Sequence, residues 1–304
     1  MITYSLVNNI EDIRTLWNSE LGFIYPIAGD VFNQNVILYP QKYVLGAFDK
    51  DKLVGFIVGK KNITDIVSYV DMGWISLIFV SKKYRKQGIG SHLLEEVEKY
   101  LDVKTINVGK DINNFFPGVP CDFDWVTDTF FIKRGYTDGG YTHDVININP
   151  QKIQLRNKQY QFKVCTLNEK EALLAHMRDN FPGRWFYDVD DYFKDGGKGD
   201  EYVICLDGNK VIGFARINDR KFKHISYNIT WYQRFNNLGG IGPLGVDSAY
   251  RGQDIGFDIV AFGINTLLER KISEILIDWT SILAFYRQFG FEVWKSFKFL
   301  SKKG

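Results

Sequence analysis

A short apolar segment followed by an amphipathic one forms the most informative stretch of the chain, residues 74–101. Trp74 to Val80 is a run of aliphatic and aromatic residues that is long enough for a buried strand and too short for a helix. From Ser91 onward, apolar residues recur at helical spacing, with charged residues between them. The pattern predicts a strand, a connection and an amphipathic helix, in that order.

The predicted connection is rich in glycine and in hydrogen-bond donors: Arg85-Lys86-Gln87-Gly88-Ile89-Gly90. A helix start presents unpaired backbone N–H groups and the positive end of the helix dipole, and glycines let the backbone approach a bulky anion closely. The loop therefore suits a phosphate group. Its glycine spacing matches neither the dinucleotide fingerprint nor the P-loop, which argues against NAD and nucleoside triphosphates as ligands.

The same pattern returns, altered, in the second half of the chain. Three pairs of segments correspond in sequence: 84–90 with 250–256, 52–56 with 210–214, and 130–136 with 285–291. A repeat of whole-domain length indicates a duplicated domain. We therefore expect a first domain at residues 1–148, a linker at 149–159 around Pro150, and a second domain at 160–304.

Hydrophobic periodicity and turn residues predict the remaining elements. In the first domain we expect strands at 2–7, 43–48, 53–58 and 104–108, helices at 10–17 and 126–133, and a closing strand after Tyr136. In the second domain we expect strands at 160–165, 202–206, 211–217, 244–246 and 275–277, a helix at 169–178, and a break at 181–185. Residues 109–124 are interrupted by proline and glycine, so they are expected to form a loop over a site.

Composition restricts the class of protein. The chain has 304 residues, of which 45% are hydrophobic and 24% charged, which is ordinary for a globular protein of two domains. A net charge of +2 gives no support for nucleic-acid binding. Cys121, Cys165 and Cys205 are widely spaced and are expected to be buried, reduced thiols. The absence of a signal-like start and of long apolar runs leads us to expect a cytoplasmic protein with no membrane partner.

The strand, glycine loop and helix, followed downstream by Phe130-Phe131-Ile132-Lys133-Arg134-Gly135-Tyr136, resemble two successive motifs of the GNAT acetyltransferase superfamily. The resemblance implies a mixed α/β (α+β) fold of two GNAT-like domains. Each would be a largely antiparallel sheet, splayed between its fourth and fifth strands and flanked by helices. It also implies acetyl-CoA as cofactor and no metal. The implied cofactor contacts are Ile78, Phe79, Val80, Arg85, Lys86, Gln87, Gly88, Ile89, Gly90, Ser91, Asn114 and Phe131 in the first half, and Val246, Arg251, Gly252, Gln253 and Gly256 in the second.

Each half resembles the family in a different part of the site. The first half has the full glycine loop, but Phe131 stands where many members have a tyrosine that protonates the departing thiolate, and phenylalanine cannot donate a proton. The second half has this tyrosine, Tyr286, but Asp254 replaces the central glycine of its loop. A carboxylate about 5 Å from a phosphate oxygen would cost roughly 3 kcal/mol at an effective dielectric near 20, and far less if turned outward. We therefore expect the first half to be the main CoA site.

Three carboxylates are candidates for the base that removes a proton from the acceptor amine. Asp122, Asp124 and Asp278 follow the last core strand of their domains, where a splayed cleft would open. Each also fits the role of a solvated loop carboxylate or a helix cap.

The expected function is acetyl transfer from acetyl-CoA to a primary amine of a small acceptor. Segments 115–120 and 181–185 resemble tandem GNAT proteins for which an amino sugar is one candidate acceptor. A non-catalytic acyl-CoA-binding or sensory module is an alternative, suggested by Phe131 and Asp254. Aminoacyl transfer is another alternative, although the modest net charge argues against a transfer RNA partner. The protein is expected to be a monomer with two similar halves, or a homodimer.

Overall fold

The computed structural model describes residues 1–123 and 127–304. The helices and strands of the first half are β1 (Ile2–Leu6), α1 (Glu11–Leu21), α2 (Gly29–Phe32), β2 (Lys42–Asp49), β3 (Lys52–Lys61), β4 (Met72–Val80), α3 (Ile89–Leu101), β5 (Thr105–Val108), β6 (Val119–Pro120), α4 (Thr127–Ile132) and β7 (Thr137–Asn147). Those of the second half are β8 (Gln161–Val164), α5 (Lys170–Asn180), α6 (Arg184–Lys194), β9 (Tyr202–Asp207), β10 (Lys210–Asn218), β11 (Leu238–Val246), α7 (Ile255–Glu269), β12 (Glu274–Thr280), α8 (Leu283–Arg287) and β13 (Glu292–Lys303).

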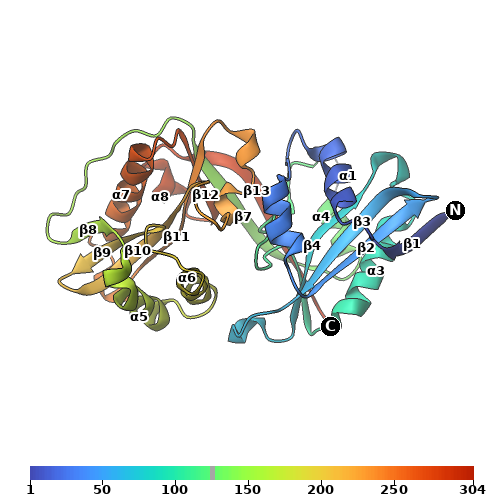
Figure 1. Cartoon of the computed structure of the whole chain (residues 1–304), viewed down its shortest axis with the longest axis horizontal. Helices are drawn as coiled ribbons and strands as arrows, with labels where there is room; N and C mark the ends of the chain where they lie inside the picture. The colour runs from blue at the N-terminus through green and yellow to red at the C-terminus, as the bar shows by residue number, and fades with distance from the viewer. Residues whose placement is uncertain (124–126) are drawn as a thin grey trace.

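A single mixed sheet runs through both halves, which lie side by side along the long axis (Figure 1). Its strand order is β1-β2-β3-β4-β5-β13-β7-β12-β11-β10-β9-β8, and β6 pairs with β13. Within each half most pairs are antiparallel, while β4 with β5 and β11 with β12 are parallel. The predicted mixed α/β fold with two similar halves is confirmed.

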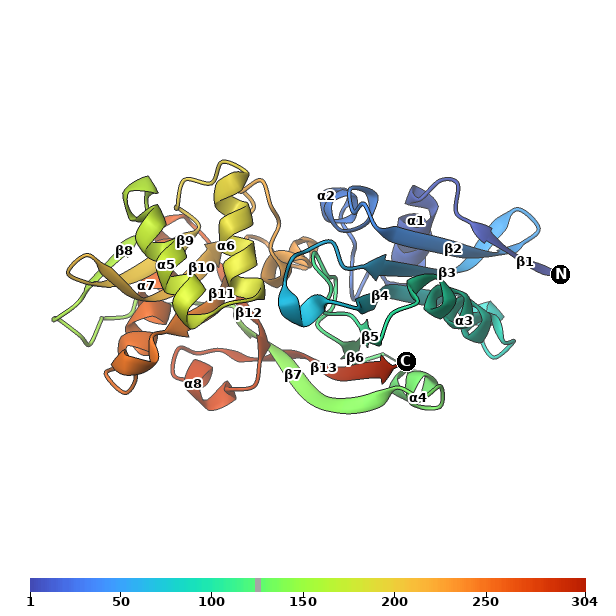
Figure 2. The ribbon, with the colours of Figure 1, turned by 90° about the horizontal axis from the view of Figure 1, so that it is seen from below.

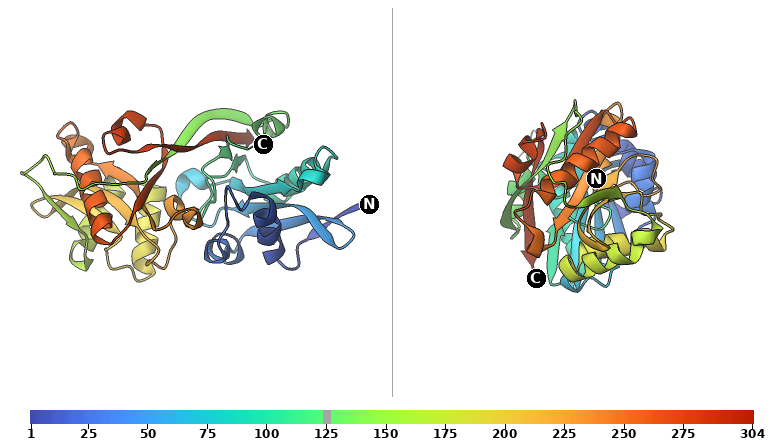
Figure 3. Two further views of the ribbon diagram at one scale, coloured as in Figure 1. Left: turned by 90° about the horizontal axis from the view of Figure 1, so that it is seen from above. Right: turned by 90° about the vertical axis from the view of Figure 1, so that its left-hand side faces the viewer.

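The two halves exchange their last strands. β13, from the second half, lies between β5 and β7, and β7, from the first half, lies against β12 (Figures 2 and 3). The closing strand expected after Tyr136 therefore forms, but β13 separates it from β5. Sequence could not reveal this, because the backbone hydrogen bonds of a ladder are the same for any partner strand.

Helices cover both faces of the sheet in each half. In the first half, α3 packs Leu93, Leu94 and Val97 on one face, and α1 packs Ile13 and Trp17 on the other. In the second half, α7 covers one face, and α5 and α6 cover the other. The approach of α3 is close: a Cβ added at Gly59 would lie 2.2 Å from Val97 Cγ2, so this strand position requires glycine.

Several elements differ from the sequence prediction. The break expected at 181–185 is short, because α6 begins at Arg184 directly after Gly183, whose φ of +110° few other residues adopt. Strand β13 was not predicted. Cys165 and Cys205 are buried, but Cys121 is exposed, so the expectation of three buried thiols is wrong for Cys121. No helix in the described part of the chain is long and apolar enough to cross a membrane.

Phe297 on β13 provides a test of the strand exchange. Its side chain is fully buried in the core of the first half, with its ring centroid 6.1 Å from that of Phe116. We expect Phe297→Ala to lower the free energy of unfolding by about 3–5 kcal/mol, as for other buried phenylalanines. Because β13 joins both halves, tryptophan fluorescence and circular dichroism should report one shared transition in urea.

The matched control is Val293→Ala on the same strand, where the side chain is 42% exposed and the expected loss is below about 1 kcal/mol. A loss below about 1 kcal/mol for Phe297→Ala, or separate unfolding of the two halves, would contradict the interpretation of β13 as a shared structural strand.

Candidate active site

In each half there is a point where two neighbouring parallel strands of the sheet diverge. In the second half, β11 and β12 pair only from Leu238 to Gly240 and from Glu274 to Leu276. Beyond this point, β11 follows β10 and β12 follows β7. In the first half, the pairing of β4 with β5 ends at Ile75 and Val108. The two openings differ greatly in the space they contain.

The opening in the first half is almost filled. Its cavity has a volume of about 40 Å³ and is walled by aromatic side chains, including Trp17, Phe116 and Phe131. The chain after β5 turns back into the opening, where the Gly109 N–H donates to the Ile75 carbonyl oxygen at 2.9 Å. These side chains occupy the space between the diverging strands, so among residues 1–123 and 127–304 little room is left there for an extended ligand.

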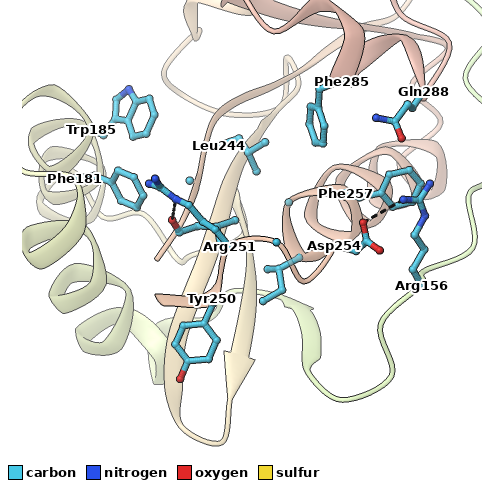
Figure 4. Close-up of a pocket in the computed structure, with 15 residues that line it drawn as sticks. Arg156, Phe181, Trp185, Leu244, Tyr250, Arg251, Asp254, Phe257, Phe285 and Gln288 are labelled. Atoms are coloured by element: carbon cyan, nitrogen blue, oxygen red, sulfur yellow. Dashed lines mark hydrogen bonds and ion pairs between the residues drawn. The ribbon is translucent and has the colours of Figure 1, made fainter. Parts of the chain in front are cut away.

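The second half has a much larger cleft, of about 530 Å³ (Figure 4). The end of β11, the glycine loop and the start of α7 form its floor, and Phe285 and Gln288 border it on one side. Phe181 and Trp185, with ring centroids 5.2 Å apart, form an aromatic wall on the other side. The cleft thus combines the unpaired N–H groups of a long helix with apolar walls.

The Asp254 side chain is turned toward a cation. Asp254 has a φ of +57°, directly before α7, and its carboxylate lies 3.3 Å from Nη1 of Arg156 (Figure 4). The Arg156 guanidinium in turn lies 3.4 Å from the ring centroid of Phe257. The ion pair offsets the negative charge beside the helix start, so the repulsion expected from Asp254 is much reduced.

The predicted cofactor residues of the second half lie together. Val246, Arg251, Gly252 and Gly256 all line the cleft, and Nε of Arg251 donates to the Val246 carbonyl oxygen at 3.3 Å. Gln253 is turned outward, where its side chain accepts a hydrogen bond from Tyr160 at 2.9 Å.

The predicted residues of the first half are dispersed. Ile78 and Phe131 line the small cavity, whereas Phe79 is buried in the core under α1, where it packs against Trp17. Nε of Arg85 donates to the Val80 carbonyl oxygen at 2.8 Å, and Gln87 donates to Lys83 at 3.3 Å.

The rest of the first loop surrounds the start of α3. Gly88 and Lys86 have φ values of +82° and +61°, and Ile89 is buried where the helix begins. Gly90 packs against Phe130, and Ser91 accepts a hydrogen bond from Arg134 at 2.5 Å. Asn114 lies elsewhere, at the junction between the halves, where Arg184 binds it at 3.3 Å.

Asp278 lies two residues beyond the last pairing between β11 and β12. Its Oδ1 is 3.5 Å from the position that a Cβ on Gly242 would take, which places the carboxyl group at the point where the strands diverge. Burial raises the pKa of Asp278 to about 6, while its own backbone N–H and Arg184 act in the opposite direction. Asp278 is therefore a base that is ionised near neutral pH and readily protonated.

Two residues near Asp278 escaped the sequence analysis. Asp144, on the exchanged strand β7, accepts a hydrogen bond from the Trp279 N–H at 3.0 Å, and Trp279 has a φ of +54°. Burial and the neighbouring charge of Asp278 raise the pKa of Asp144 well above its usual range. Arg184 begins α6 and lies 5.3 Å from the ring centroid of Trp279. Only its place in the segment 181–185 had drawn attention to Arg184.

The other predicted catalytic residues differ in their surroundings. Tyr286 is buried in α8, and burial together with the charge of Asp278 raises its pKa, so the hydroxyl stays protonated. Asp122 accepts a hydrogen bond from Tyr25 at 2.6 Å and forms an ion pair with Lys295. Asp124 lies outside the described residues. Within the described ranges, no group of three or more His, Cys, Asp or Glu could hold a metal ion.

Comparisons with known proteins identify the family and the fold. The sequence profile of the acetyltransferase (GNAT) family matches residues 10–111 and 170–291. The chain belongs to the GNAT acetyltransferase family. A comparison with curated protein sequences gives no match.

Solved GNAT structures share the fold of the whole chain. The GCN5-related glucosamine N-acetyltransferase region of a fungal multi-domain GH3 beta-N-acetylglucosaminidase is 24% identical with a TM-score of 0.87, and the match covers 99% of this chain and 38% of that longer chain. A GCN5-related N-acetyltransferase from Sphaerobacter thermophilus is 14% identical with a TM-score of 0.71, covering 99% and 95%. A tandem GNAT protein from the clavulanic acid biosynthesis pathway is 10% identical with a TM-score of 0.69, covering 100% and 98%. At these identities the similarity establishes the tandem GNAT fold.

The raised pKa of Asp278 predicts an effect on stability. The folded protein holds this proton up to about pH 6, whereas the unfolded chain releases it near pH 3.8, so ionisation opposes folding at neutral pH. Asp278→Asn should therefore raise the free energy of unfolding at pH 7 by about 1–3 kcal/mol, with the gain disappearing below about pH 4. Urea denaturation across this pH range measures it.

Asp122→Asn is the matched control, because that carboxylate has partners in Lys295 and Tyr25 and its loss should not stabilise the protein. A destabilised Asp278→Asn variant at pH 7 would show that the carboxyl group at this position is not under strain from burial.

Proposed function

We propose that the protein is an acetyl-CoA-dependent N-acetyltransferase whose reaction takes place in the second half. The observation that carries this proposal is the open cleft between the end of β11 and the start of α7, in the half where Asp278 lies at the divergence of β11 and β12. The first half has the fuller glycine motif, but its opening is filled by its own side chains. The proposal therefore departs from the sequence expectation that the first half is the main CoA site.

The residues of the second-half cleft fit the cofactor. The backbone N–H groups at the start of α7 and the guanidinium of Arg251 would bind the pyrophosphate, and Gly252 leaves the approach open because nothing lies within 4 Å of its Cβ position. The apolar walls suit the pantetheine arm. The cofactor would supply an activated acetyl thioester where the strands diverge.

Asp278 and Tyr286 provide the two proton transfers. Ionised Asp278 takes a proton from the acceptor ammonium, and the free amine nitrogen then attacks the thioester carbonyl carbon. A C–N bond forms and the C–S bond breaks. Tyr286, which burial keeps protonated, gives its proton to the departing thiolate and is reprotonated by the second proton that leaves the nitrogen, while Asp278 releases its proton to solvent. The charge of Asp278 is one cause of the raised pKa of Tyr286, which supports placing the two residues in one site.

The acceptor is proposed to be a small primary amine such as an amino sugar. The structural similarity to a fungal glucosamine N-acetyltransferase region motivates this choice of acceptor. The tryptophan that follows Asp278, Trp279, offers a partly buried aromatic face on which a sugar ring could stack.

One glycine from each glycine loop, Gly88 directly before α3 and Gly252 three residues before α7, tests which half binds CoA. Gly252 and Gly88 have φ values of +80° and +82°, and neither has an atom within 4 Å of its Cβ position. Glutamate therefore introduces the same charge and similar backbone strain at both sites. We expect Gly252→Glu to weaken CoA binding at least about a hundredfold in calorimetry, because a carboxylate would enter the phosphate site, and Gly88→Glu to leave the affinity unchanged. The reverse result would return the cofactor site to the first half.

Turnover on a panel of amines tests the reaction itself. Thiol release from acetyl-CoA should require an amine, with glucosamine among the better acceptors, and Tyr286→Phe should lower kcat by about a hundredfold or more. The control is Tyr136→Phe, another buried tyrosine, which bonds Glu98 in the first half and should not affect turnover. CoA binding without amine-dependent release would instead identify a binding or sensory module, and turnover only with charged transfer RNA would identify an aminoacyl transferase.

A further inference from the structure

Arg184 joins the two halves at the candidate active site. The side chain belongs to the first turn of α6 in the second half, yet it donates to the carbonyl oxygens of Lys110 and Asp111 at 2.7 and 2.9 Å. Both carbonyls belong to the loop that follows β5 in the first half. A guanidinium has a rigid planar set of donors, so several fixed acceptors hold it in one orientation.

The loop that holds Arg184 is itself anchored by a buried ion pair. Lys60 on β3 and Asp111 are both fully buried, with Nζ and Oδ2 2.5 Å apart. Ser76 donates to the same carboxylate at 2.9 Å, and Lys60 also donates to the Asn113 carbonyl oxygen at 3.1 Å. A buried charge pair with these extra hydrogen bonds resists displacement, since moving one partner would leave the other charge unpaired. The two carbonyls that bind Arg184 are therefore fixed in place.

The other side of the guanidinium faces the residues around Asp278. Its central carbon lies 4.4 Å from the ring centroid of Tyr227 and 5.3 Å from that of Trp279, the residue after Asp278. Nε of Arg184 lies 3.9 Å from the Asp188 carboxylate one turn along α6. Arg184 thus lies between a rigid loop of the first half and the carboxylates of the second.

We propose that Arg184 is a positioning residue of the second-half site, held by the loop of the first half so that its guanidinium lies over Trp279, the residue next to Asp278 in the chain. The inference rests on the proposed function in that Asp278 is taken as the base. It assigns the first half a role in the reaction, although the described residues of that half leave only a small cavity between its diverging strands.

Four charged or titratable side chains interact electrostatically with Asp278. Arg184 and Asp188 on α6 affect the pKa of Asp278, and Asp278 affects the pKa values of Asp144 on β7 and Tyr286 on α8. Arg184 lowers the pKa of Asp278, whereas Asp188 raises it. Burial raises the pKa of Asp144, which favours its neutral form. Arg184 and Asp188 should therefore have opposite effects on Asp278 when each is neutralised.

The test measures the ionisation of Asp278 without requiring turnover. Three backgrounds are used: the unmodified protein, Arg184→Met and Asp188→Asn. In each background, the free energy of unfolding is measured from pH 4 to pH 8 with Asp278 and with Asp278→Asn, and the difference between the two is taken. The pH at which this difference changes reports the Asp278 pKa in each background. We expect it to rise by about half a unit to one unit in Arg184→Met and to fall by a similar amount in Asp188→Asn.

The acidic limb of the pH profile of kcat/KM, measured with acetyl-CoA and glucosamine, should move to higher pH in Arg184→Met and to lower pH in Asp188→Asn, because the base acts only when ionised. Arg184→Lys should leave the limb in place but lower kcat roughly tenfold, because an ammonium keeps the charge without the planar set of donors.

Arg220→Met is the matched control, since Arg220 also connects the halves, through Asp30 at 3.4 Å, but is half exposed and away from Asp278. It should leave both readouts unchanged.

Three results would overturn the inference: no shift in either background, shifts of the same sign, or an equal shift in Arg220→Met. If Arg184→Met does not fold, two other results test the inference: the fall of the Asp278 pKa in Asp188→Asn and the loss of kcat in Arg184→Lys. Full turnover by Asp278→Asn would reject the proposed base but would not affect the stability measurement. Failure of Asp278 as the base can therefore be distinguished from failure of Arg184 as a positioning residue.

Discussion

The ladder between β7 and β13 is the interaction on which the rest of the structure depends. These two strands pair along most of their length, from Glu292 with Ile146 to Ser301 with Thr137, and each then joins the sheet of the opposite half. One ladder thereby turns two sheets into a continuous one and fixes how the halves face each other. The contacts of Arg184 with the first-half loop, and of Asp144 with the Trp279 backbone, both require this fixed arrangement.

The contrast between the two halves follows from competition for the space between diverging strands. In the first half, aromatic side chains and the chain after β5 fill that space, and the start of the same loop provides the carbonyl oxygens that bind Arg184. In the second half, the space stays open beside α7, and the carboxylate before this helix is paired with Arg156. A glycine motif therefore indicates that a helix start can receive an anion, but whether a ligand fits depends on side chains elsewhere.

Sequence patterns predicted many helices, strands and loops of this structure, because interactions between residues close in the chain determine them. Residues 74–101 and their copy were recognisable as strand, loop and helix, since apolar period and glycine position act within a few residues. Asp278 was also among the candidates, because it follows a core strand. The partner of β13, the role of Asp144 and the orientation of Asp254 were not predictable in this way. Each depends on a residue or strand more than ninety positions away in the chain, namely β5, Trp279 and Arg156.

The strand exchange also constrains the order in which the protein can fold. During synthesis β13 is made after every other strand of the sheet, yet it borders β5 and β6 of the first half. Until then, the edge of β5 and the aromatic core around Phe116 lack their covering strand, and β7 lacks its neighbour on the side of the first half. Contacts between residues so far apart in sequence form slowly and leave apolar edges exposed in the meantime. The first half is thus synthesised first but completes its sheet last. While the nascent chain is still on the ribosome, the first half lacks the strand that finishes its fold.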